Sequence, residues 1–298
     1  MIQYTTCPIC NSLAIAYVHD SIDYTVSKKK FSIWECHNCF VRFTQDVPSQ
    51  QEIGPYYKAE AYISHTDTQK GLINKIYHKV RNYTLKSKRK LIQHETSLSK
   101  GNILDIGCGT GAFLNEMKSA SWNITGLEPD KKASKMASKL YGINTQNPEV
   151  LFQLPKNSYD AITMWHVLEH VHQLHEYIKA LHDLIKDNGS IFIAVPNYTS
   201  YDASHYKEHW AAYDVPRHLF HFSPQSMEAL LNKHGLKLKS IQPMWFDSFY
   251  VSMLSQHIKY KRGNVIIAFI VGVLSNIDAF FNKKKCSSVI YVIEKKVQ

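Results

Sequence analysis

The 298-residue sequence lacks the segments that mark a secreted or membrane-spanning chain. No basic start followed by a cleavable apolar core stands at the N-terminus, so we expect no secretion signal. The longest apolar run, at 265–281, is too short and too interrupted by Asn276 and Asp278 to predict a bilayer span. Internal repeats and low-complexity tracts are also missing. We therefore expect a folded cytoplasmic chain.

Acidic residues are scarce relative to basic ones, 25 against 35, which gives a net charge of +10. Much of the excess lies in lysine-rich stretches at 28–30, 86–90 and 283–285. Such stretches are typical of solvated surface, and they also suit an anionic partner such as nucleic acid, phospholipid or a phosphorylated substrate. The length allows one sizeable α/β domain with a small unit beside it.

Cysteine is rare as well, but four of the six cysteines form two CxxC pairs. These are Cys7, Cys10, Cys36 and Cys39. Two such pairs can close a tetrahedral thiolate site around Zn²⁺, with no open position for substrate. We predict a structural zinc ribbon over residues 1–46. Redox pairs or incidental thiols are the alternatives, but neither pair sits on a predicted strand-to-helix turn. Cys108 and Cys286 read as packing residues.

Three of only 12 glycines cluster at Gly107, Gly109 and Gly111, directly after an apolar stretch at 103–106. The pattern predicts a strand, a tight turn with left-handed backbone and a helix from 112 to 117. A second strand at 124–127 ends in Glu128, where a βαβ unit places a partner for ribose hydroxyls.

The run from Asp105 to Gly111, with Glu128 after the next strand, resembles the nucleotide-binding motifs of class I S-adenosylmethionine-dependent methyltransferases. The resemblance implies S-adenosylmethionine as cofactor, held by Asp105, Gly107, Gly109, Gly111 and Glu128. NAD-binding Rossmann proteins are the nearest competitor. They resemble this stretch less, because here the last glycine comes one position early.

Strands and helices alternate from residue 100 onward, so we predict an α/β fold with a doubly wound, seven-stranded Rossmann-like sheet over 100–298. Its third strand is expected at 143–145, followed at 147–149 by a polar neighbour for adenine. Residues 47–99 are predicted as linker and lid helices. Apolar positions at Leu72, Ile76, Val80 and Tyr83 recur at helical spacing there. Tyr56, Tyr57 and Tyr62 are the predicted lid residues.

After the predicted fourth strand comes Trp165, then the run HVLEH from His166 to His170. This run is similar to the family that includes ubiquinone-pathway O-methyltransferases and several sugar methyltransferases. Because parallel strands end at the binding crevice, Trp165 and His166 are expected to point into it, Trp165 as a cofactor contact. His166 is the first candidate for a general base. The other catalytic candidates are Glu169, His170 and His218.

A cluster of polar and aromatic residues at 213–222 follows the fifth strand. Charges among rings are costly to bury unless something satisfies them, so Tyr213, Arg217 and His218 are predicted to line a substrate pocket. The alternative is that Arg217 pairs with Asp214 and locks the loop.

The acceptor stays open at this point: a nucleotide sugar, a polysaccharide or a quinol. The second class of function is an RNA methyltransferase that binds through the ribbon and the basic helix. For the apolar stretch at 265–281 three accounts compete. They are a buried helix, a homodimer interface, and a membrane-surface helix anchored by Lys259, Lys261, Arg262 and the lysines at 283–285.

Overall fold

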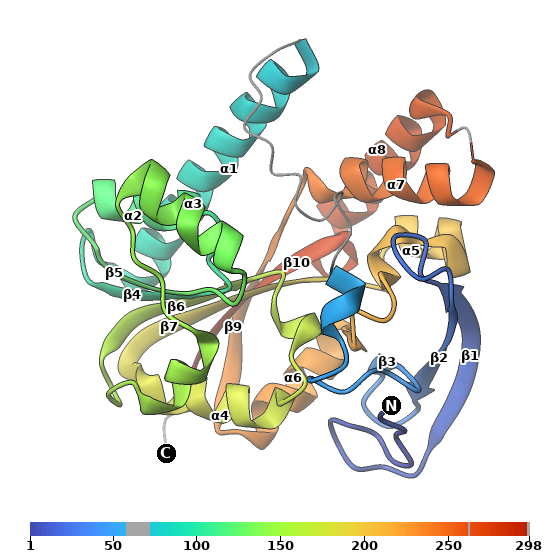
Figure 1. Ribbon diagram of the computed structural model, residues 1–298, viewed down its shortest axis with the longest axis horizontal. Helices are drawn as coiled ribbons and strands as arrows, with labels where there is room; N and C mark the ends of the chain where they lie inside the picture. Colours follow the sequence, from blue (N-terminus) through green and yellow to red (C-terminus); the bar gives the residue numbers. More distant parts are fainter. Residues whose placement is uncertain (58–71, 262, 297–298) are drawn as a thin grey trace.

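The computed structural model describes residues 1–57, 72–261 and 263–296, and the side chains of helix α1 only from residue 79. The predicted lid residue Tyr62 and the predicted anchor Arg262 lie outside this range. Two sheets organise the chain (Figure 1).

The larger sheet has six strands in the order β5-β4-β6-β7-β10-β9. Their bounds are β4 (Asn102–Ile106), β5 (Asn123–Leu127), β6 (Tyr159–Trp165), β7 (Ile185–Pro196), β9 (Leu236–Pro243) and β10 (Ser288–Lys295). The four strands from β5 to β7 pair in parallel, and β10 runs antiparallel to both of its neighbours. This arrangement confirms the predicted α/β architecture.

The sheet has one strand fewer than predicted. The stretch expected as a strand at 143–145 makes no ladder, and the next residue, Gln146, forms a single parallel bridge with Leu127. Two backbone hydrogen bonds hold it there, Glu128 N–H to Gln146 O and Gln146 N–H to Gly126 O. A helix cap at Asn147 begins immediately afterwards, so the segment ends before it can extend the sheet.

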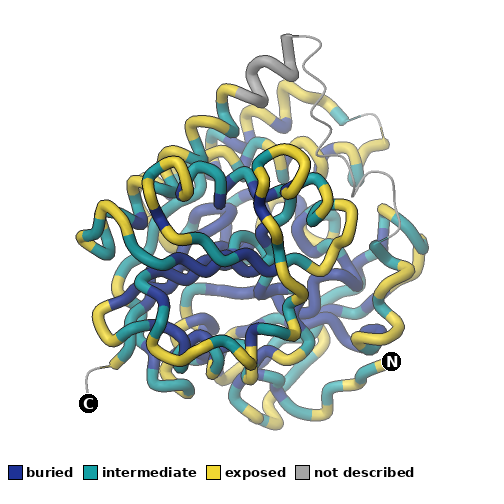
Figure 2. Tube along the Cα trace, turned by 60° about the vertical axis from the view of Figure 1, so that its left-hand side comes forward, coloured by how far each residue is buried: buried dark blue, intermediate teal, exposed yellow. Residues whose placement is uncertain are grey.

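Helices cover both faces of the large sheet (Figure 1). On one face lie α1 (Leu72–Thr96), α2 (Ala112–Ser119) and α3 (Lys131–Tyr141), and on the other lie α4 (Leu174–Leu184) and α6 (Pro224–Lys233). Strand residues alternate between the layers: Ile103 packs with α1 and α2, and its neighbour Leu104 packs in the opposite cluster. Figure 2 shows the buried strands inside a shell of exposed loops.

Helix α1 packs through its C-terminal half. Ile92 is fully buried against the sheet, and Arg89 pairs with Glu116 of α2 at 2.8 Å. Tyr83, predicted on the apolar face, is 64% exposed. Figure 1 gives the reason, because the N-terminal half of α1 extends past the edge of the sheet.

The smaller sheet joins the N-terminal segment to a distant part of the chain. Its order is β1 (Ile15–Ile22), β2 (Lys30–Cys36), β3 (Arg42–Thr44) and β8 (Phe220–His221). Strand β3 pairs with β8 across more than 170 residues of sequence, so the predicted ribbon shares one sheet with residues 220–221.

Three helices lie beside the small sheet at one end of the molecule (Figure 1). They are α5 (Tyr201–Tyr206), α7 (Asp247–Tyr260) and α8 (Val265–Phe281), and both α5 and α7 contact α8. Helices α7 and α8, between strands β9 and β10, form the helical hairpin.

Candidate active site

The turn between β4 and α2 has the backbone that its glycines predict. Gly107, Gly109 and Gly111 have φ angles of 70°, 55° and 76°, in the left-handed region that favours glycine. A Cβ on Gly107 would meet Val167 Cγ2 at 2.4 Å, so this position also has no room for a side chain. Within the part of the chain that the structure describes, no side chain caps α2, which leaves the first N–H groups of the helix available to a ligand.

Glu128 braces this turn. One carboxylate oxygen accepts from Gly109 N–H at 2.7 Å and the other from Asp130 N–H at 2.8 Å. Burial raises the pKa of the carboxyl group above its usual value, and the two N–H donors oppose that shift. The spacing that suggested one site is thus matched by direct contact between the turn and Glu128.

A cavity of about 580 Å³ opens beside the turn, and we call it the donor cavity. Its wall includes Gln50, Ile53, Tyr57, Gly107, Glu128, Pro129, Asp130, Pro148, His166, Val167, His170 and Tyr177. The volume is in the range of small-molecule sites. Of the predicted lid residues, Tyr57 lines the cavity, and its hydroxyl lies 3.1 Å from His170 Nδ1.

Of the predicted cofactor contacts, Gly107 and Glu128 line this cavity, and Asp105, Gly109, Gly111 and Trp165 are not among its lining residues. Asp105 is buried beneath the turn and accepts a hydrogen bond from Thr163 Oγ1 at 2.6 Å, and burial raises its pKa to about 7. The Trp165 ring packs edge-on against Phe113 and lies 4.0 Å from Lys88 Nζ. Asn147, expected near adenine, caps the following 3₁₀ turn with its side chain.

His166 lies between two carboxylates. Its Nε2 is 3.0 Å from Asp247 Oδ2, and its Nδ1 is 3.4 Å from Glu169 Oε1. Burial favours the neutral ring, but the carboxylates outweigh it and raise the pKa of His166 to about 10. The ring is therefore an imidazolium at neutral pH, with Nε2 hydrogen-bonded to Asp247 and Nδ1 at ion-pair distance from Glu169, which counts against a role as general base.

His170 is in the opposite state. Burial and the neighbouring His218 lower its pKa to about 4, so it is neutral at physiological pH. Its Nδ1 lies 3.0 Å from the carbonyl oxygen of Arg217, which can only accept, and 3.1 Å from the Tyr57 hydroxyl, which can also accept; a proton on Nδ1 serves both and leaves a lone pair on Nε2. Donor atoms of Glu169, His170 and His218 lie within 4.8 Å of one another, a set that suits a divalent cation.

Arg217 and Tyr213 do not reach the donor cavity. Arg217 is 1% exposed and holds Asp214 with two nitrogens at 2.6 and 2.9 Å. It also donates to Asp23 of the ribbon at 3.0 Å and to the Tyr56 carbonyl at 3.0 Å. Tyr213 is 2% exposed, with its hydroxyl 2.8 Å from Arg42 Nη1. The alternative in which Arg217 pairs with Asp214 is the one the structure contains. These groups form the arginine cluster: Arg217, Asp214, Asp23 and the Tyr56 carbonyl.

Two further residues of the site carry no local sequence signal. Asp247 begins α7, 81 residues after the histidine that it contacts. Lys88 comes from α1, and burial lowers its pKa to about 8. Together with Tyr83, Trp245 and Phe246 they line a second cavity of about 230 Å³.

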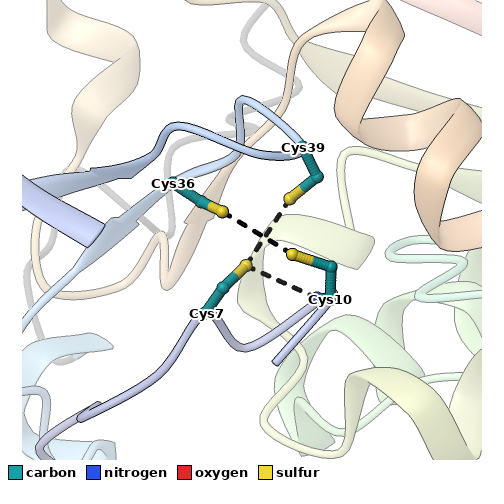
Figure 3. Close-up of side chains that lie close together, drawn as sticks. All are labelled: Cys7, Cys10, Cys36 and Cys39. Atoms are coloured by element: carbon teal, nitrogen blue, oxygen red, sulfur yellow. Dashed lines mark hydrogen bonds between the residues drawn. The ribbon is translucent and has the colours of Figure 1, made fainter. Parts of the chain in front are cut away.

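The four predicted zinc ligands converge (Figure 3). Cys7 Sγ lies 3.5 Å from Cys39 Sγ, and Cys10 Sγ lies 3.6 Å from Cys36 Sγ. Tetrahedral Zn²⁺ at its usual thiolate distance requires sulfurs about 3.8 Å apart. The N–H groups of Ile9, Cys10 and Asn38 point at these sulfurs. The donor set therefore fits zinc.

Comparison with known proteins agrees with this geometry. A family described as "Methyltransferase domain" matches residues 77–241, more than half of the chain. The mitochondrial ubiquinone biosynthesis O-methyltransferase of Bos taurus is 27% identical over 168 residues, 51% of this chain and 45% of that protein. The corresponding protein of Rickettsia canadensis is 22% identical over 169 residues, 53% of this chain and 72% of that protein. The chain spans about half the length of the mitochondrial relatives that it matches.

Among solved structures, a putative sarcosine dimethylglycine methyltransferase from Galdieria sulphuraria superposes with a TM-score of 0.50. It is 15% identical and covers 72% of this chain and 85% of that protein, a likeness that shows the fold alone. Fold, glycine turn and family match agree. The chain belongs to the family of proteins built on this methyltransferase domain.

Proposed function

We propose that this protein transfers a methyl group from S-adenosylmethionine to an oxygen of a small-molecule acceptor. The observation that carries the proposal is the donor cavity, which is lined by Gly107 of the left-handed turn, by Glu128, and by His166 and His170. The match to the methyltransferase domain and the ubiquinone biosynthesis O-methyltransferases supports it.

The residues of the cavity suit an adenosyl ligand. Gly107 lines the cavity and lets the turn pack directly against Val167, because it has no Cβ. Each oxygen of Glu128 accepts one backbone N–H, and a carboxylate offers about four lone-pair sites, so capacity is left for ribose hydroxyls. The sulfonium of the bound donor would supply an already activated methyl group, so the protein has to orient the acceptor and accept its proton.

We assign the proton-accepting role to His170. Its neutral ring lines the cavity and keeps a lone pair on Nε2. His166 is held as a cation by Asp247 and Glu169 and fixes this part of the cavity lining. It contributes positive charge beside the acceptor oxygen while that oxygen loses its proton. This division of roles replaces the expectation that His166 is the base.

The acceptor class that we propose is a hydroxylated aromatic compound such as a quinol. The mitochondrial and bacterial relatives carry the name ubiquinone biosynthesis O-methyltransferase. The second cavity includes Asp247, the partner of His166 in the wall of the donor cavity, and is lined by Tyr83, Trp245 and Phe246, side chains that suit an aromatic ring.

Calorimetry with S-adenosylmethionine tests the donor site, and S-adenosylhomocysteine release tests the acceptor. Hydroxylated quinols, nucleotide sugars and RNA are compared as acceptors, and we expect turnover with the quinols. Absence of donor binding at high micromolar concentration would contradict the whole proposal. Turnover with RNA or a nucleotide sugar alone would contradict the acceptor class. His170→Gln is expected to lower turnover about 100-fold or more while donor binding stays intact.

We further propose that Cys7, Cys10, Cys36 and Cys39 hold one structural Zn²⁺, which supplies folding energy to the ribbon. Elemental analysis of purified protein should find about one zinc per chain. Cys36→Ser should lose the metal and lower the melting temperature, while Cys286→Ser should keep the metal. Full metal content in the Cys36→Ser protein would refute this site.

A further inference from the structure

The helical hairpin formed by α7 and α8 buries small and polar side chains and exposes large apolar ones. The residues that α7 buries against the protein are Ser248, Ser252, Ser255 and Gln256. The residues that α8 buries are small: Ala268, Val271, Gly272, Ser275 and Ala279. A surface helix of a soluble protein normally buries its large apolar side chains and exposes its polar ones. Here the side chains on the buried face of the hairpin, which we call the inner face, are small and largely polar.

The inner face is tightly held. A Cβ on Gly272 would meet Phe249 Cδ1 at 2.7 Å, so the two helices approach as closely as glycine allows. Ser275 Oγ donates to Asp202 Oδ1 at 2.7 Å, which ties α8 to α5. Ser248 Oγ lies 3.0 Å from Asn276 Oδ1 and links the two helices of the hairpin. These contacts fix the hairpin in this orientation, with its large side chains directed outward.

The outer face is strongly apolar. On α8, Ile266 is 71% exposed and Phe281 82% exposed. Other exposed large apolar residues of the two helices recur at helical spacing: Tyr250, Met253, Leu254, Tyr260, Ile270, Leu274, Ile277 and Phe280. An exposed apolar surface of this extent marks an interaction site. The buried-helix account of residues 265–281 is therefore wrong, because most of the large side chains of α8 face away from the protein.

Positive charge accompanies this face at both ends. Residues 248–285 contain five lysines and a single aspartate. Lys259 and Lys261 stand at the turn between the helices, and the lysines at 283–285 follow α8 directly. Lys283 and Lys284 are exposed. Among the residues that the structure describes, neither ammonium group has an ion-pair partner.

We propose that the helical hairpin docks on the surface of an anionic phospholipid membrane. Its apolar stripe would lie in the boundary between headgroups and acyl chains, and the lysines would meet lipid phosphates. Within the described ranges 1–57, 72–261 and 263–296, no helix has the length and hydropathy that crossing a bilayer requires. A parallel, peripheral orientation is thus the one that these helices can adopt.

Charge decides between a membrane and a second copy of the chain. A twofold dimer through this face would bring two sets of lysines to one interface, with one aspartate in each copy of the segment to compensate. Anionic headgroups neutralise the same lysines. The proposal does not depend on the methyl donor, so it stands or falls separately from the proposed function.

Vesicle co-sedimentation tests the proposal. The full-length protein is mixed with vesicles of phosphatidylcholine alone or of phosphatidylcholine with phosphatidylglycerol. We expect strong binding only to the vesicles that contain phosphatidylglycerol, and weaker binding as salt is added.

Two variants and two matched controls locate the binding surface. Ile266→Ser with Phe281→Ser is expected to weaken partitioning about 100-fold. Lys283→Gln with Lys284→Gln is expected to weaken it about 30-fold. Leu13→Ser with Leu140→Ser removes two exposed apolar side chains elsewhere, and Lys135→Gln with Lys139→Gln removes two exposed lysines from α3. Both controls should bind as the wild type does. All substituted positions are exposed, so circular dichroism should show unchanged folding.

Three results would overturn the proposal. The first is no binding to either kind of vesicle. The second is binding that the hairpin variants leave unchanged. The third is a concentration-dependent dimer that Ile266→Ser with Phe281→Ser dissociates in the absence of lipid, which would assign the face to a second copy.

Discussion

The donor cavity and the arginine cluster are both rich in polar side chains, but they differ in how those side chains are satisfied. Glu128 and His170 keep unused hydrogen-bonding capacity toward an open cavity. Arg217 is 1% exposed, with its donors directed to Asp214, Asp23 and a backbone carbonyl. A dense polar stretch is thus compatible with a site or with an internal brace. Counting the partners of each group distinguishes the two.

The largest effect should follow from disrupting the arginine cluster. Arg217→Met removes the cation from the buried carboxylate of Asp23 and the partly buried carboxylate of Asp214, so we expect a loss of about 3–5 kcal/mol in unfolding free energy. Urea denaturation measures it. Arg89→Met, which breaks the half-buried pair with Glu116, is the matched control and should cost about 1 kcal/mol or less. Equal losses in the two variants would mean that the arginine cluster contributes no more to the unfolding free energy than the Arg89–Glu116 pair does.

Gly107→Ala should change the donor cavity and leave the arginine cluster intact. The new methyl group meets Val167 at 2.4 Å in a left-handed backbone, so donor affinity should fall about 100-fold or more. Gly142→Ala is the control, because Gly142 has a φ of 62° with no atom within 4 Å of the added Cβ. Calorimetry should show normal donor binding for that control. Unchanged affinity in Gly107→Ala would remove the glycine turn from the site.

Glu128→Gln should give a smaller loss, about tenfold in donor affinity, since an amide keeps one acceptor oxygen for two N–H groups. Glu228→Gln, on the exposed side of α6, provides the comparison and should have no effect. If the two variants bind the donor equally well, Glu128 has no part in holding the ribose.

The smallest effect concerns pH. The folded-state pKa of His166, about 10, lies above its ordinary value of 6.5, so its stabilising contribution is full below pH 6.5 and is lost as the pH rises toward 10. His166→Gln should therefore cost about 1 kcal/mol near pH 6, discounted because the ring is 35% exposed, and little once the pH has risen through the folded-state pKa. Denaturation curves across this range measure the difference. A difference that grows with pH would reverse the assigned protonation state.

Local patterns in the sequence predicted the parts of the site whose members are close along the chain. The strand, glycine turn and helix from 102 to 119 depend on neighbouring residues, and so does the placement of Glu128 one helix and one strand later. The CxxC pairs are equally local, and their sulfurs converge as predicted.

Contacts between distant segments could not be predicted in this way. Asp23 and Arg217 are 194 residues apart, and neither has a neighbour in sequence that indicates the other. Asp247 begins a helix with no motif of its own, yet it contacts His166. The three accounts of residues 265–281 could not be narrowed for a related reason, because an apolar sequence does not show which environment its side chains will meet. The strand predicted at 143–145 does not form, because a cap at Asn147 ends the extended segment.

The pairing of β3 with β8 has a consequence for how this chain can be divided. Truncation at residue 47 would leave β8 without β3, expose the backbone edge of Phe220 and take Asp23 away from Arg217. A fragment that starts there should aggregate or be proteolysed, even though it retains every residue of the matched family segment. The smallest stable unit of this molecule is therefore larger than its catalytic motifs suggest, because the first residues of the chain complete a sheet that the later ones begin.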